Sequence, residues 1–129
     1  MNSSTTPYRI EIEVFTKYVH ARITADDVDR VIAMSFLSDV LMECAKQRRK
    51  RLILERSNPG AVIEAELFYI MDDLLKMKDE TKIAFLNRHM LHAEEIRDVV
   101  AYGANLGGNY RCFNSFEKAE QWLLEDSDE

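Results

Sequence analysis

Two short runs of alternating apolar and polar residues follow one another near the start of the chain, and they constrain the fold more than any other feature. In residues 8–15 the apolar side chains fall on one face and the charged ones on the other, which is typical of a strand with one solvated face. Residues 17–23 repeat the pattern less regularly. Because almost nothing separates the two runs, they predict an antiparallel hairpin that turns near Thr16.

After the hairpin, helical and strand patterns alternate to the end of the chain. The predicted helices run from an N-cap at Thr24 to Gln47, over residues 63–75, from His92 to Leu106, and onward from a cap at Asn114. Apolar runs at 51–55, 82–87 and 110–113 predict buried strands between them. Strands joined by helices run parallel, because the helix carries the chain back across the sheet. The sequence therefore predicts an α/β fold with one mixed five-stranded sheet in the order β-β-α-β-α-β-α-β-α.

The composition fits a single folded domain. The chain has 129 residues, of which 47% are hydrophobic and 31% charged, which is ordinary for a globular protein. Neither a repeat nor a linker interrupts it, so we expect one domain over 8–125. Residues 1–7 are small and polar and predict a disordered tail, and residues 126–129 predict a short acidic tail.

Charge and targeting patterns narrow the classes of function. The formal net charge of −6 disfavours binding to nucleic acid, because phosphates repel an acidic protein. No apolar run approaches the roughly 18 residues that a membrane span requires, and no signal peptide is visible. Cys44 and Cys112 are interpreted as buried thiols of a reducing compartment. We expect a cytoplasmic protein without a membrane span.

The block from Tyr110 to Leu123 carries a family resemblance. Its strand, its short turn with Phe113 and Phe116, and its helix with Ala119 and Trp122 resemble the ending of bacterial SpoIIAA-like proteins. The order of the predicted elements is similar to that of the SpoIIAA-like (STAS-like) fold over nearly the whole chain. The resemblance implies a regulatory, protein-interacting domain. This fold is also grouped with CRAL-TRIO lipid-binding domains, which implies an apolar cavity as an alternative.

The phosphorylated anti-sigma-factor antagonists of this fold carry a switch serine after the third strand. The resemblance places that loop at residues 55–62, where Ser57 is present but the Asp-Ser-x-Gly arrangement is absent. The phosphorylation of Ser57 therefore stays open.

Motifs for catalysis or metal binding are weak. His89 and His92 are three residues apart with Glu94 and Glu95 close by, but no further Cys or His supplies a third and fourth ligand, so no metal site is predicted. Adjacent aspartates such as Asp72 and Asp73 point about 100° apart on a helix and do not converge as an acid–base pair. No glycine-rich phosphate loop follows a strand. We expect a non-enzymatic protein without a cofactor.

The expected working surface lies beyond the carboxyl ends of the parallel strands, where open α/β sheets place their binding loops. We predict a non-enzymatic regulatory or protein-interaction module of STAS-like type. Its partner-binding residues are predicted to be Arg56, Ser57, Asn58, Asn87, Arg88 and His89. The alternative is a carrier or sensor of a lipid or small apolar ligand, with Phe68, Met71 and Leu75 lining its cavity. A homodimer remains open.

Overall fold

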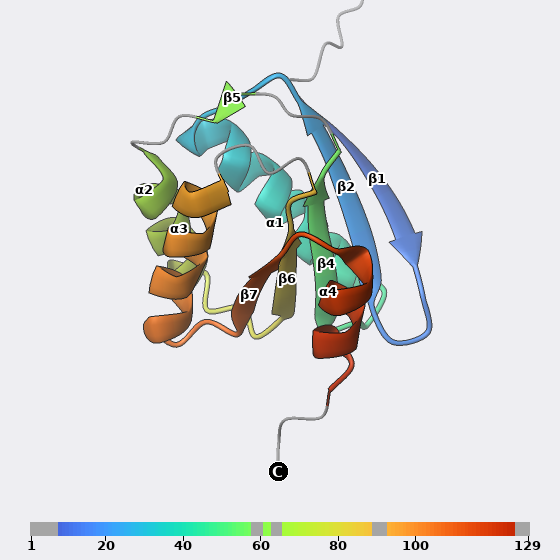
Figure 1. Ribbon diagram of the computed structural model, residues 1–129. Helices are drawn as coiled ribbons and strands as arrows, with labels where there is room; N and C mark the ends of the chain where they lie inside the picture. Colours follow the sequence, from blue (N-terminus) through green and yellow to red (C-terminus); the bar gives the residue numbers. More distant parts are fainter. Residues whose placement is uncertain (1–7, 58–60, 63–65, 89–92, 126–129) are drawn as a thin grey trace, which may run out of the picture.

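The computed structural model describes residues 8–57, 61–62, 66–88 and 93–125. The two predicted tails, residues 1–7 and 126–129, lie outside the described residues. Figure 1 shows a sheet with helices on both of its faces.

The sheet has five strands in the spatial order β1-β2-β4-β6-β7. β1 (Tyr8–Val14) and β2 (Val19–Ala25) form the antiparallel pair that the alternating runs predicted. β2 continues in parallel with β4 (Arg51–Arg56), followed by β6 (Lys82–Leu86) and β7 (Tyr110–Phe113). The predicted mixed sheet and its order of helices and strands are confirmed.

The hairpin turn between β1 and β2 contains no glycine. The Phe15 N–H donates to the Tyr18 carbonyl oxygen at 2.8 Å, and the two aromatic rings stack with their centroids 4.8 Å apart. No residue of this turn has a positive φ angle, so the turn does not need the glycine that the common two-residue hairpin turns favour.

A second sheet, which the sequence analysis missed, joins two of the connections. It consists of β3 (Asp27–Val28) and β5 (Ala61–Val62), paired in parallel. The predicted helix start at Thr24 was wrong, because β1 holds β2 in the sheet as far as Ala25. Helix α1 (Arg30–Lys46) begins instead after Asp29, whose carboxylate accepts a bond from the Ile32 N–H at 2.9 Å.

The remaining helices are α2 (Leu67–Lys76), α3 (Ala93–Asn105) and α4 (Phe116–Leu123). The predicted starts of the second and third helices, Ile63 and His92, lie outside the described residues. The cap of the last helix was predicted one residue early. It is Ser115 rather than Asn114. Ser115 has the extended backbone of an N-cap, and its hydroxyl accepts a hydrogen bond from the Lys118 N–H at 3.4 Å.

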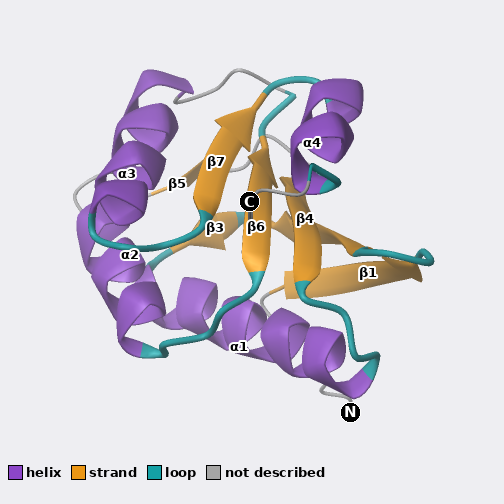
Figure 2. Ribbon diagram, turned by 90° about the horizontal axis from the view of Figure 1, so that it is seen from below, coloured by secondary structure: helices purple, strands orange, loops and turns teal. Residues whose placement is uncertain are grey.

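The two faces of the sheet bury separate hydrophobic clusters. In Figure 2, α1, α2 and α3 lie on one side of the sheet, and α4 lies alone on the other. The larger cluster packs beneath the three helices and includes Val19, Leu52 and Ile83. The smaller cluster packs beneath α4 and includes Ile53, Ala84 and Leu123. The alternation of side chains along each strand divides the residues between the two clusters.

Polar contacts hold α4 against its face. The Lys82 Nζ donates to the carbonyl oxygens of Trp122 and Glu125 at 2.8 and 3.1 Å, so a buried cation satisfies the carboxyl end of the helix. The Tyr18 hydroxyl donates to Glu120 at 2.6 Å.

Among the described residues, no helix is long and apolar enough to cross a membrane.

Two adjacent leucines test how much the packing of α4 contributes. Leu123 is fully buried, whereas Leu124 is 38% exposed. We expect Leu123→Ala to lower the free energy of unfolding by about 2–5 kcal/mol, because it removes buried methyl groups and leaves a cavity. Leu124→Ala, the matched control, should lower it by less than about 1 kcal/mol. Urea denaturation measures both, and equal losses would contradict this packing.

Candidate functional site

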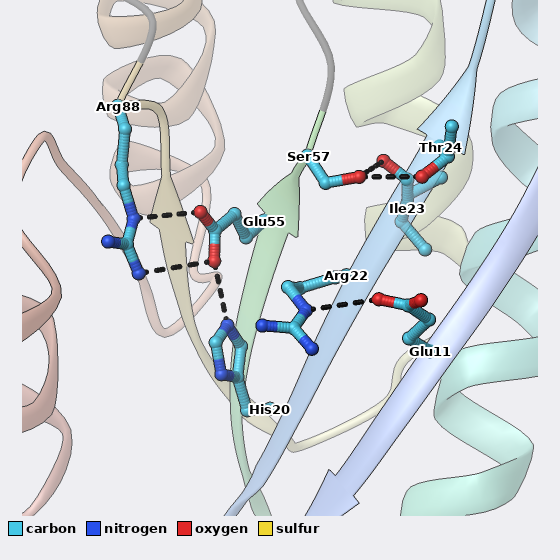
Figure 3. A network of polar contacts seen from close by, with 8 residues as sticks. All are labelled: Glu11, His20, Arg22, Ile23, Thr24, Glu55, Ser57 and Arg88. Carbon is cyan, nitrogen blue, oxygen red and sulfur yellow. Dashed lines mark hydrogen bonds and ion pairs between the residues drawn. The ribbon is translucent and has the colours of Figure 1, made fainter.

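The candidate site lies at the carboxyl edge of the parallel strands, where β2, β4 and β6 end side by side. Glu55, near the end of β4, is buried with only 6% of its surface exposed. Its Oε1 lies 2.8 Å from His20 Nε2 on β2, and its Oε2 lies 2.8 Å from Arg88 Nε, just beyond β6. Figure 3 shows the carboxylate between its two partners, His20 and Arg88. Three sequence-distant elements therefore meet at one carboxylate.

An aromatic ring from α4 covers this network. The Phe116 ring lies 5.2 Å from the His20 ring, centroid to centroid. The Arg88 guanidinium carbon lies 5.8 Å from the centroid of the same ring. The network is thus closed on one side by the first residue of α4, which excludes water from part of it.

Burial explains why the three groups belong together. A carboxylate taken out of water is strongly destabilised unless charged or hydrogen-bonding partners replace the lost hydration. His20 is 5% exposed and donates one such bond, and Arg88 supplies a charge-assisted bond. The Arg88 side chain remains 49% exposed. The Arg88 guanidinium is therefore held in one direction by Glu55, and its other edge faces solvent.

Ser57 is the second exposed polar group at this edge. Its backbone N–H donates to the Ile23 carbonyl oxygen at 2.9 Å, which extends the pairing of β4 with β2. Its hydroxyl lies 2.6 Å from the Thr24 hydroxyl, as Figure 3 shows. Ser57 is therefore held at the end of the sheet with its side chain at the surface.

Arg56, predicted to offer charge to a partner, is arranged differently. Its side chain is partly buried, and one guanidinium nitrogen donates to the Ala25 carbonyl oxygen at 2.7 Å. Its Nε is buried and has no hydrogen-bond partner among the described residues. Desolvation lowers the pKa of this guanidinium. Arg56 lies on the face of β4 that α1, α2 and α3 cover, opposite to the α4 face that carries Glu55.

Of the other three predicted site residues, the structure describes only Asn87. Asn58 and His89 lie outside the described residues. Asn87 is partly buried, and its N–H donates to the Phe113 carbonyl oxygen at 2.8 Å, which ties the ends of β6 and β7 together. The structure thus brings Arg88 to the Glu55 network and holds Ser57 at the neighbouring strand end.

The predicted site residues did not include His20, Glu55 or Phe116. A signal for Glu55 was present, because a carboxylate closing the apolar run RLILE requires a partner if that strand is central. Its partner His20 is 35 residues away, and only the parallel register of β2 and β4 brings the two onto one face.

An apolar cavity opens on the other face of the sheet at the same edge. Its volume is about 150 Å³, similar to that of an engineered cavity that holds a benzene molecule. It is lined mainly by apolar side chains of the sheet, α1 and α2, with Arg56 and Asn87 at its border. The apolar lining includes Val28, Ala33, Leu54 and Phe85.

The residues predicted to line a ligand cavity lie elsewhere. Met71 is buried against Gly103, where an added Cβ would collide with the Met71 sulfur. Phe68 is 45% exposed and packs edge-on against Tyr102, with centroids 5.0 Å apart. Leu75 packs against the main core. None of the three lines the 150 Å³ cavity.

The thiols and metal-binding residue types form no further cluster in the described part of the chain. Burial raises the pKa of the Cys44 thiol to about 12 and also raises that of Cys112. No group of three or more His, Cys, Asp or Glu residues there could hold a metal ion. His89 and His92 fall outside that part.

Comparisons with known proteins support the fold. No protein-family model and no curated protein sequence matches the chain. An anti-sigma factor antagonist from Mycobacterium paratuberculosis is similar in structure, with a TM-score of 0.59 and 11% identity over 92% of this chain and 95% of that one. An uncharacterized protein of the DUF3478 family from Shewanella loihica PV-4, described as having a SpoIIAA-like fold, gives a TM-score of 0.56 and 14% identity over 95% and 98%. The predicted SpoIIAA-like fold is confirmed, and at these identities the likeness concerns the fold alone.

Two ion-paired glutamates test whether the Glu55 network contributes to stability. We expect Glu55→Gln to lower the free energy of unfolding by about 1–3 kcal/mol, because Arg88 and the buried His20 lose a charged acceptor. Glu11 pairs with Arg22 at 3.3 Å on the exposed edge of the same sheet. Glu11→Gln should therefore change the stability by less than about 1 kcal/mol. Chemical denaturation compares the two variants, and similar effects would show that Glu55 is effectively solvated.

Proposed function

We propose that this SpoIIAA-like chain is a non-enzymatic regulatory module that binds a protein partner at the carboxyl edge of its sheet. The observation that carries the proposal is the half-exposed Arg88, which the buried Glu55 holds in one direction. A fixed guanidinium loses little side-chain entropy when it meets an acidic group of a partner. Ser57 adds a hydroxyl at the neighbouring strand end.

The likeness to an anti-sigma factor antagonist supports a regulatory role, since that protein acts on another protein. Of the predicted surface of Arg56, Ser57, Asn58, Asn87, Arg88 and His89, the residues Ser57 and Arg88 are exposed at this edge, and Asn58 and His89 lie outside the described residues. In the proposed interface Arg88 supplies charge and Ser57 hydrogen bonding. Arg56 supports the edge from within, through its bond to Ala25.

Substitutions at Arg88 test this surface. The protein would be immobilised and its specific partners quantified by mass spectrometry from cells that naturally contain it. Arg88→Gln should reduce capture of a specific partner by about tenfold or more, since one charge-assisted bond at an interface contributes about that much. Arg88→Lys should restore it only in part, because lysine lacks the planar fork. Ser57→Ala should weaken capture less.

Arg9→Gln on β1 is the matched control, because it removes another exposed arginine, from the far edge of the sheet. It should leave capture unchanged. Equal capture by the wild-type protein and the Arg88 and Ser57 variants, all shown to be folded, would refute the proposed surface.

The second candidate function is the binding of a small apolar ligand, which the 150 Å³ cavity favours. The cavity would take a molecule of about benzene size. A hydrogen-bond acceptor on such a ligand would suit the unpartnered Nε of Arg56 at its border. This cavity is distinct from the position predicted around Phe68, Met71 and Leu75.

Filling the cavity tests the second candidate. Ala33 is buried on α1 and lines the cavity, whereas Ala45 is exposed on the same helix. We expect wild-type protein and Ala45→Leu to show saturable NMR shifts of the cavity residues with benzene, and Ala33→Leu to show none. Native mass spectrometry would also detect a retained ligand. Shifts that persist in Ala33→Leu would place binding elsewhere.

A further inference from the structure

A second hollow lies at the same edge of the sheet, between β7 and the first turns of α3 and α4. Its volume is about 290 Å³. Three cationic side chains from three different elements line it: Arg97 from α3, Arg111 from β7 and Lys118 from α4. We call this hollow the cationic pocket. It opens at the ends of β6 and β7, the position where open α/β sheets bind ligands.

The cations of the pocket lack carboxylate partners. In the described part of the chain, the ion pairs engage other residues, such as Arg22, Arg30 and Arg88, but not Arg97, Arg111 or Lys118. Among the described residues that line the pocket there is no aspartate or glutamate. In a chain with 23 acidic and 17 basic residues, three unpaired cations around one hollow are a departure from the average surface.

Other residues of the pocket act on its cations. The Arg111 guanidinium lies over the Phe113 ring, 5.6 Å from its centroid, which restricts its direction. The positive charge of Arg97 acts on the Cys112 thiol, which also lines the pocket, and opposes the rise in the pKa of that thiol that burial causes. Asn87 and Asn114 complete the polar part of the lining.

We propose that the cationic pocket binds the phosphate group of a small phosphorylated molecule. Two guanidinium groups suit the bidentate binding of a phosphate, and a third cation suits an anion that carries nearly two charges at neutral pH. The hollow is close to the lower limit of small-molecule sites, so it accommodates a phosphate and a small attached group. This inference is independent of the protein-partner surface, which rests on Arg88 and Ser57.

Calorimetric titration at low ionic strength tests the assignment, with inorganic phosphate and phenyl phosphate as probes. Both should bind at one site with a Kd of roughly millimolar or below, and phenyl phosphate should bind more tightly, because its ring contacts the wall of the pocket. The double variant Arg97→Gln/Arg111→Gln should weaken both by about tenfold or more. Arg9→Gln/Lys17→Gln removes the same charge from exposed positions of the β1–β2 hairpin and should change affinity by less than about twofold.

The stability of the unliganded variants separates a binding role from a structural one. Removing two like charges that repel each other should leave the melting temperature unchanged or raise it, whereas cations that stabilise the fold would lower it on removal. Phosphate should raise the melting temperature of wild-type protein but not of the pocket double variant.

Several outcomes would overturn the assignment. These are the absence of saturable binding, equal affinity in the pocket and control double variants, or binding of sulfate as tight as that of phenyl phosphate. A phosphoserine peptide that bound about tenfold more tightly than phenyl phosphate would assign the pocket to a modified protein instead. Loss of partner capture by Arg88→Gln with phosphate binding intact would support both proposals separately.

Discussion

Both faces of β4 have to be covered before this sheet is stable, and that requirement places the other elements. Leu52 and Leu54 need the layer of α1, α2 and α3, and Ile53 needs α4. The second cover is narrow: a single helix with its side chains is about 10 Å wide, whereas five strands are about 19 Å across. Beyond its reach the outer face becomes polar. Glu55 lies at this limit, too buried to be hydrated and close enough to solvent to pair with Arg88.

Much of the fold was predictable, because strand alternation and helical periodicity are local properties of the sequence. The errors have tertiary causes. Thr24 resembles the N-cap of a helix, but the pairing of β1 with β2 as far as Ala25 overrides that local pattern. The position of Ser57 and Arg88 at the carboxyl edge of the sheet could be predicted from the parallel order of the strands. The partners that fix Arg88 did not, because His20, Glu55 and Phe116 come from three elements whose register no local pattern contains.

Three features of different chemistry share the carboxyl edge of the sheet. The Glu55 network lies on the α4 face, the apolar cavity on the opposite face, and the cationic pocket beside the last strand. Asn87 borders both hollows and links the ends of β6 and β7 through its backbone. Parallel strands bring their ends to one edge, so neighbouring loops can carry unrelated recognition surfaces on a common frame.

The small β3–β5 sheet gives the apolar cavity a property beyond its size. Val28 lines the cavity and also belongs to β3, which pairs with β5 through two residues only. A two-residue ladder separates at a much lower free energy than the central strands, so it opens by local fluctuation while the core stays folded. Opening of this short ladder would therefore displace one part of the cavity wall while the central strands stay paired. The shape of the cavity is then set in part by a local equilibrium and not by the packing of the core alone.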